Sequence, residues 1–157
     1  MANLASSKVA KQAMAHIEPD FKSIKQFTRL TMVFTNNSQI HQMINMPAKP
    51  ADKATAILNT YDLIAIRTEE KALTEQAFTR SDADIITIDL SQRLNYFLDK
   101  TWFKLAIQRG VQFEVAFGPS LESSECRKNF MMNAMQLIKL SKGKNIIFAS
   151  EASSQLY

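Results

Sequence analysis

Five short segments of the chain are rich in apolar, β-branched and aromatic residues, and each is bounded by turn-forming or charged residues. This pattern predicts strands. The predicted strands are Phe27–Phe34, Tyr61–Ile66, Asp84–Leu90, Val111–Phe117 and Asn145–Ser150.

Helical patterns lie between the predicted strands. In "TEEKALTEQAF", Thr68 is the expected N-cap, with two glutamates in the first turn, where the helix dipole favours them. A second helix is expected to begin at Ser123 or Ser124 and to end at Gly143. Its apolar face is predicted to carry Phe130, Ala134, Leu137 and Ile138. Strands that alternate with helices predict a parallel sheet with right-handed crossovers.

Three of the strands alternate between apolar and more polar positions, which favours a barrel over an open sheet buried on both faces. Phe113 and Val115 share one face of their strand, and Glu114 lies on the other. Arg29 lies on the polar face of the first strand, so we expect Arg29 and Glu114 to form an ion pair inside the barrel. Five strands cannot close an eight-stranded barrel, which usually takes about 250 residues. The predicted fold class is therefore α/β, a partial or truncated (β/α) TIM-type barrel with about five recognisable parallel strands.

Charge is distributed unevenly in this chain of 157 residues. Residues 1–90 carry 10 basic and 10 acidic side chains, whereas residues 91–157 carry 9 basic and 5 acidic ones. The whole net charge of +4 therefore comes from the second part. Such an excess of positive charge indicates either a polyanionic partner or a surface whose charge only keeps the protein soluble. No run of about eighteen apolar residues is present, so no membrane span is predicted.

Residues suited to catalysis are few. A metal-dependent phosphoesterase needs several His, Asp and Glu ligands at strand ends. The only histidines are His16 and His41, and neither lies at the end of a predicted strand. Cys126 is the single cysteine, which excludes an internal disulfide, and no histidine base is evident for it. We therefore expect no metal site, no cofactor and no catalytic residue. The segment "FGPS" at Phe117–Ser120 is either a plain corner or a helix N-terminus that accepts a phosphate.

Basic and aromatic residues are interleaved in "RLNYFLDKTWFKLAIQR". Its aromatic residues either stack on unpaired RNA or lie buried in the protein, and its basic residues can reach phosphates in both cases. Lysines also gather at the end of the last predicted helix, where cations are favoured by the helix dipole. Three methionines in that helix, Met131, Met132 and Met135, are expected to fill the core, although a partner groove is the alternative.

Four pieces of the chain, in this order and spacing, resemble one known family. They are "YDLIAIRTEEKALTEQA", "DADIITIDL", "LAIQRGVQFEVAFGP" and especially "NAMQLIKLSKGKNIIFASEA". They are similar to the TIM-barrel, thirty-kilodalton protein subunit of nuclear ribonuclease P and ribonuclease MRP. The resemblance covers residues 24–152. Residues 1–23 are expected to form an N-terminal helix not matched to the family, and residues 24–157 a partial barrel domain.

The resemblance implies a non-catalytic subunit that supports removal of tRNA 5′ leaders, and rRNA processing, by binding RNA and other subunits. Its implied partners are ribonuclease P/MRP RNA, precursor tRNA indirectly, and other protein subunits of the Pop5 type. Its implied location is the nucleus and nucleolus. The alternatives are a stand-alone metal-dependent barrel phosphoesterase or a partial chain with no independent function. The candidate RNA-binding residues are Arg93, Lys104, Arg109, Arg127, Lys128, Lys142 and Lys144.

Overall fold

The computed structural model describes residues 25–34 and 60–151. The expected N-terminal helix and both histidines lie outside the described residues. The elements, in chain order, are β1 (Arg29–Phe34), β2 (Leu63–Thr68), α4 (Lys71–Arg80), β3 (Ile85–Ile88), α5 (Lys100–Gln108), β4 (Gln112–Ala116), the short 3-10 helix η2 (Gly118–Leu121), α6 (Ser124–Ser141) and β5 (Ile146–Ala149). No helix in these two stretches is long and apolar enough to cross a membrane.

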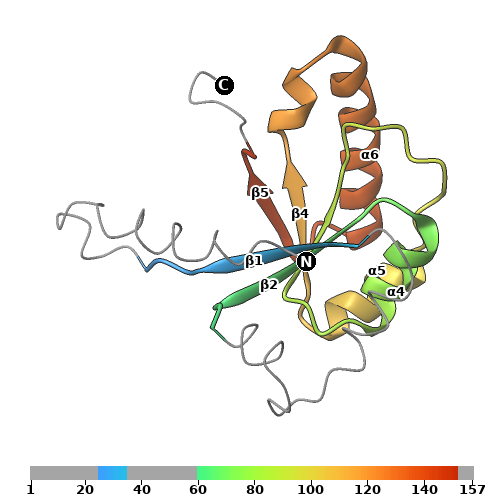
Figure 1. Ribbon diagram of the computed structural model, residues 1–157. Coiled ribbons are helices and arrows are strands. Elements are labelled where there is room, and N and C mark those ends of the chain that lie inside the picture. The colour runs from blue at the N-terminus through green and yellow to red at the C-terminus, as the bar shows by residue number, and fades with distance from the viewer. Residues whose placement is uncertain (1–24, 35–59, 152–157) are drawn as a thin grey trace, which may run out of the picture.

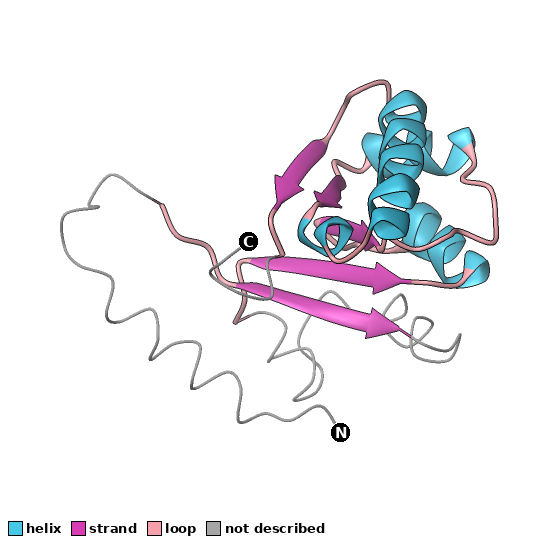
Figure 2. Cartoon of the chain, turned by 90° about the horizontal axis from the view of Figure 1, so that it is seen from above, coloured by secondary structure: helices cyan, strands magenta, loops and turns pink. Residues whose placement is uncertain are grey.

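The strands form one sheet in which every pairing is parallel and the spatial order is the chain order, β1-β2-β3-β4-β5. The three long helices α4, α5 and α6 lie together on one face of this curved sheet (Figures 1 and 2). Consecutive parallel strands joined by helices on one face are the arrangement of a (β/α) barrel. The predicted fold class is therefore confirmed: an α/β chain with five parallel strands, as in part of a TIM-type barrel.

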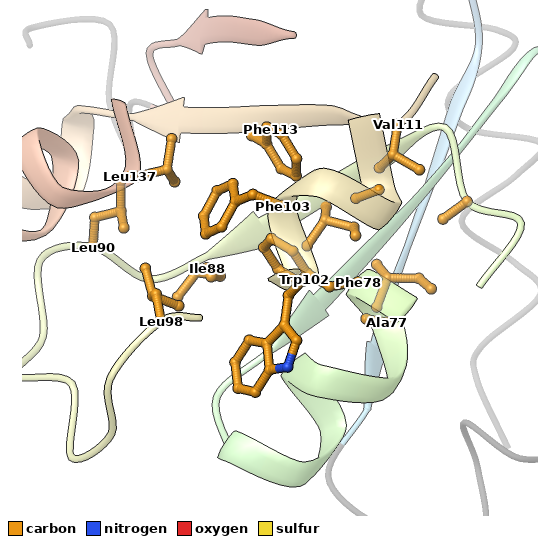
Figure 3. Packing of buried hydrophobic residues seen from close by; sticks show 14 of the residues in the cluster. Ala77, Phe78, Ile88, Leu90, Leu98, Trp102, Phe103, Val111, Phe113 and Leu137 are labelled. Atoms are coloured by element: carbon orange, nitrogen blue, oxygen red, sulfur yellow. The ribbon is translucent and has the colours of Figure 1, made fainter. Parts of the chain in front are cut away.

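The core lies between the sheet and these helices, and aromatic rings dominate it. Phe113 of β4 stacks on Phe78 of α4, with ring centroids 5.4 Å apart. Phe103 of α5 packs against both rings at 4.9 and 4.8 Å. Trp102 closes the group beside Phe78 (Figure 3). Burial within the protein is therefore confirmed for Trp102 and Phe103, whereas Phe97 of the same segment is exposed.

The start of α4 differs from the prediction. The helix begins at Lys71 after the N-cap Glu70, and Thr68 is the last residue of β2. Thr68 pairs with Phe34 and Ile88 across the sheet, and its buried hydroxyl is hydrogen-bonded to that of Thr74 at 2.9 Å. The prediction of Thr68 as N-cap was wrong because ladder pairing on both sides extends β2 by two residues.

Helix α6 begins as predicted, because the hydroxyl of Ser123 accepts a hydrogen bond from the backbone N–H of Cys126. It ends at Ser141, where Lys142 adopts the left-handed conformation with φ 58°. Ala134 and Leu137 face the core as expected, but Ile138 is 39% exposed. The expected core role of Met131, Met132 and Met135 was also wrong, since all three lie on the surface. The buried side of α6 includes Asn133 and Ser141 instead. Ile138 and the three methionines therefore lie on the sides of the helix that face away from the core.

The "FGPS" segment is a corner directly after β4 that contains the start of η2, and its geometry requires glycine. The N–H of Gly118 donates to the carbonyl of Ser150 at 2.7 Å. A Cβ atom at residue 118 would lie 2.3 Å from that same carbonyl oxygen. The corner therefore joins the end of β4 to the residues that follow β5.

Candidate nucleic-acid interface

The concave face of the sheet holds an ion pair whose carboxylate is buried and whose guanidinium is partly exposed. Both terminal nitrogens of Arg29 donate to the carboxylate of Glu114, with Nη2 2.6 Å from Oε2. The hydroxyl of Thr87 donates to the same carboxylate at 2.5 Å. Burial by itself raises the pKa of Glu114, but these hydrogen bonds and the positive charge of Arg29 leave that pKa below its ordinary value. Glu114 is therefore a fully partnered carboxylate.

A second group of charges lies at the carboxyl ends of the strands, where barrel enzymes carry their catalytic residues. Arg67 of β2 forms ion pairs with Glu151, at 3.1 Å, and with Asp89, at 3.7 Å. Asp89 also accepts hydrogen bonds from the backbone and hydroxyl of Ser91. No group of three or more His, Cys, Asp or Glu residues within 25–34 and 60–151 is placed to hold a metal ion.

The first basic surface is a groove between α5 and the end of α6, called here the lysine groove. Lys104, Lys142 and Lys144, three of the predicted RNA-binding residues, line it together. Lys100 lines it too, with Ile107 and Leu140 between the charged walls. The groove encloses about 360 Å³. The prediction omitted Lys100, although its spacing of four residues from Lys104 puts both lysines on one side of α5.

The second basic surface is a shallow cavity near the start of α6, called here the Arg93–Lys128 hollow. Arg93 follows β3 and Lys128 lies in the second turn of α6, so the two belong to segments that leave neighbouring strands. Asn133 holds the Arg93 loop against α6, since its side-chain amide donates to the carbonyls of Leu90 and Gln92 at 2.9 and 2.8 Å. Glu125 also lines the hollow and offsets part of its charge. Arg127, which precedes Lys128 in the chain, is exposed but lines neither of the two basic surfaces.

Arg109 does not join either surface. Its guanidinium donates to the carbonyls of Phe78 and Thr79, at 2.5 and 2.9 Å, at the end of α4. Carbonyls at a helix end have no partner within the helix, so Arg109 satisfies them and attaches α4 to α5. It lines a small cavity with Asp82 and Asp84. This cavity lies at the amino ends of β3 and β4, the edge opposite the one where barrel enzymes carry their catalytic residues.

Comparison with known proteins gives a family and a fold. A family model described as RNase P subunit p30 matches residues 3–157. This match includes most of the segment 1–23, which holds none of the motifs that carried the resemblance.

Curated relatives match most of this chain. The Arabidopsis thaliana protein GAMETOPHYTE DEFECTIVE 1 is 30% identical over 136 residues, covering 87% of this chain and 22% of its own length. Ribonuclease P protein subunit p30 of Mus musculus is 29% identical over 136 residues, covering 86% of this chain and 47% of its own length. A probable ribonuclease P protein subunit 3 of Schizosaccharomyces pombe is 27% identical, covering 86% of this chain and 53% of its own length. The chain thus spans about half of the length of the last two, and less of the first.

A solved structure has the same fold. A chain of archaeal ribonuclease P, determined with mature tRNA, superposes with a TM-score of 0.66 at 17% sequence identity. The superposition covers 94% of this chain and 58% of that one.

Proposed function

The chain belongs to the RNase P subunit p30 family, whose model matches residues 3–157, and from this membership we propose that it is a protein subunit of the ribonuclease P/MRP ribonucleoprotein. In this role it supports removal of 5′ leaders from precursor tRNA, and rRNA processing, by binding RNA and other subunits. It is not itself the catalyst.

The observation that best supports a non-catalytic role is the pairing of the interior carboxylates. Metal-assisted hydrolysis needs carboxylates or imidazoles free to bind the ion and a water molecule. Glu114 is committed to Arg29, while Asp89 and Glu151 are committed to Arg67. Arginine neutralises the charge that a metal ion would otherwise neutralise. The polar interior is therefore a structural network.

The RNA contacts are proposed for the lysine groove, the Arg93–Lys128 hollow and Arg127. These residues are exposed and lie on the basic part of the chain. Phosphate contacts from Lys and Arg supply most of the affinity of such proteins for RNA, and they orient the complex. Arg109 is left out because its guanidinium already donates to two carbonyls of α4.

The partners follow from the same membership. We propose ribonuclease P/MRP RNA as the direct RNA partner, precursor tRNA as an indirect one, and a protein subunit of the Pop5 type. The nucleus, with the nucleolus, is the corresponding location. The relatives named as ribonuclease P subunits in mouse and fission yeast support this assignment.

Depletion of the protein in the cells that express it tests the proposal. Sequencing of the 5′ ends of tRNAs should show precursors that retain their leaders, and expression of a depletion-resistant copy should remove them. An accumulation of 3′-extended precursors instead, or mature 5′ ends throughout depletion, would contradict the proposed function.

A further inference from the structure

The walls of the lysine groove come from two stretches of chain without any acidic residue. No Asp or Glu occurs from Lys100 to Phe113, the stretch that contains α5. None occurs from Cys126 to Ser150, which contains most of α6 and β5. Positive charge in the groove is therefore not offset by carboxylates of its own segments.

Among the residues that the structure describes, the lysine side chains of the groove have no ion-pair partner. The ion pairs within the described ranges join Arg29 to Glu114 and Arg67 to Asp89 and Glu151, and none includes a lysine. Four ammonium groups around one groove repel one another, and an anion with several charges relieves that repulsion. The site is thus suited to a polyanion.

Lys142 occupies a backbone position that ordinarily favours glycine. Its φ of 58° and ψ of 34° lie in the left-handed region, and Gly143 follows with φ 70°. A side chain in this conformation carries a free-energy cost that glycine avoids. A lysine nevertheless occupies this position, and it lines the groove together with Lys144. A residue in a costly conformation at a charged groove points to a use for its side chain.

The described residues of the groove offer no aromatic ring on which a base can stack. None of its lining residues within the described part of the chain is aromatic. Trp102 and Phe103, which belong to the same helix as Lys100 and Lys104, point into the core (Figure 3). The hydroxyl of Ser141 is occupied by the carbonyl of Ile138 at 3.1 Å. Recognition of single-stranded RNA combines aromatic stacking with base-edge contacts. Gln108 also lines the groove, but no aromatic residue lines it beside Gln108 in the described part of the chain.

We infer that the lysine groove binds the sugar–phosphate backbone of double-helical RNA, independently of base sequence. Lysine is a point charge on a flexible stem, which suits phosphates better than base edges. In a duplex the bases are stacked inside and the phosphates face outward, so charge without stacking platforms is sufficient. Ile107 and Leu140 pack against the core and also give the groove apolar surface, so an acidic peptide is the competing ligand that the experiment below must separate from RNA. This inference rests on the proposed function, since it specifies the RNA feature that one surface of the subunit contacts.

Fluorescence anisotropy with the full 157-residue chain tests the inference. The probes are two labelled RNA duplexes of about 16 base pairs with unrelated sequences, and one of their strands alone. The test variant is Lys142→Gln with Lys144→Gln. The matched control is Lys25→Gln with Lys71→Gln, which removes the same charge from residues that do not line the groove.

The expected result is equal affinity for both duplexes and weaker binding of the single strand. Removal of one lysine–phosphate interaction should reduce the slope of log K against log salt by about 0.9, so the slope should fall by up to about 1.8 in the test variant and hardly at all in the control. The inference is overturned if the test variant keeps the affinity and slope of the unaltered chain, or if its slope falls no further than that of the control. Preference for the single strand, or displacement of the duplex by a glutamate-rich peptide but not by tRNA, would overturn it too. Normal tRNA 5′ ends after depletion would instead contradict the proposed function, so the two failures are distinguishable.

Discussion

Arg29 and Glu114 are separated by 85 residues in the chain, yet their side chains form a two-pronged ion pair on the concave face of the sheet. Glu114 is 1% exposed and Arg29 is 27% exposed. The pair connects β1 to β4 across the two strands between them, and Thr87 of one of these, β3, is a further donor. A buried carboxylate of this kind is stable only with its partner.

Removal of one member of this pair should cost far more than removal of both. Glu114→Leu leaves the Arg29 guanidinium without its buried counter-ion and should lower the free energy of unfolding by about 3–5 kcal/mol. Glu114→Leu combined with Arg29→Met should restore much of that loss, because no uncompensated charge remains. Urea titration of both variants measures the difference. Equal destabilisation by the single and double changes would show that the ion pair is not the source of the loss.

The stability of the protein should depend on pH through Glu114. Its pKa is lower in the folded protein than in the unfolded chain, so its contribution is present above the ordinary glutamate pKa of about 4.3 and is lost as pH falls through the folded value. The difference in unfolding free energy between the unaltered protein and Glu114→Gln should thus be constant above about pH 5 and should shrink in more acidic solution. Other carboxylates titrate in both proteins and cancel from this difference. A difference that grows on acidification would contradict the assignment.

The aromatic core should be sensitive to truncation. Phe113→Ala removes a ring that stacks on Phe78 and packs on Phe103, and should destabilise the protein by about 3–5 kcal/mol. Phe97→Ala is the matched control, because the Phe97 side chain is 88% exposed, and it should change the unfolding free energy by less than about 0.5 kcal/mol. Thermal or urea unfolding of both variants is sufficient. Similar losses in the two variants would place the core elsewhere.

The purified chain should not hydrolyse phosphodiesters in the presence of Mg²⁺, Mn²⁺ or Zn²⁺. Asp89 and Glu151, which follow β3 and β5 near the usual catalytic edge of a barrel, are paired with Arg67, so they are poor ligands for a metal ion. A generic phosphodiester substrate and a short RNA provide the assay. Turnover that persists through stringent purification and disappears with a chelator would contradict the non-catalytic role.

Local pattern alone predicted most of the fold. Apolar segments located all five strands, and period-2 counting put Arg29 and Glu114 on the face where they meet. It could not find the end of β2, because Thr68 remains in the sheet through partners on two other strands. Helical periodicity likewise left Ile138 on the buried face, since it does not tell which neighbours cover each side of a helix.

The candidate surfaces depended on the three-dimensional arrangement. The basic excess of residues 91–157 was evident in the sequence, but its division into two surfaces follows from how α5 and α6 pack. Arg109 looked like another exposed cation, and only the position of the end of α4 shows that its guanidinium has structural acceptors. A lysine's sequence neighbours do not determine which helix it faces, which is why Lys100 was omitted.

The central claim is that this chain is a subunit of the ribonuclease P/MRP ribonucleoprotein, and the RNA that accompanies it in cells tests that claim most directly. The tagged chain would be recovered from a nuclear extract under stringent washing, and the associated RNA sequenced, with the tag alone as control. The account predicts strong enrichment of ribonuclease P and MRP RNA over messenger RNA and ribosomal RNA. Recovery of the folded chain without enrichment of either RNA would contradict it.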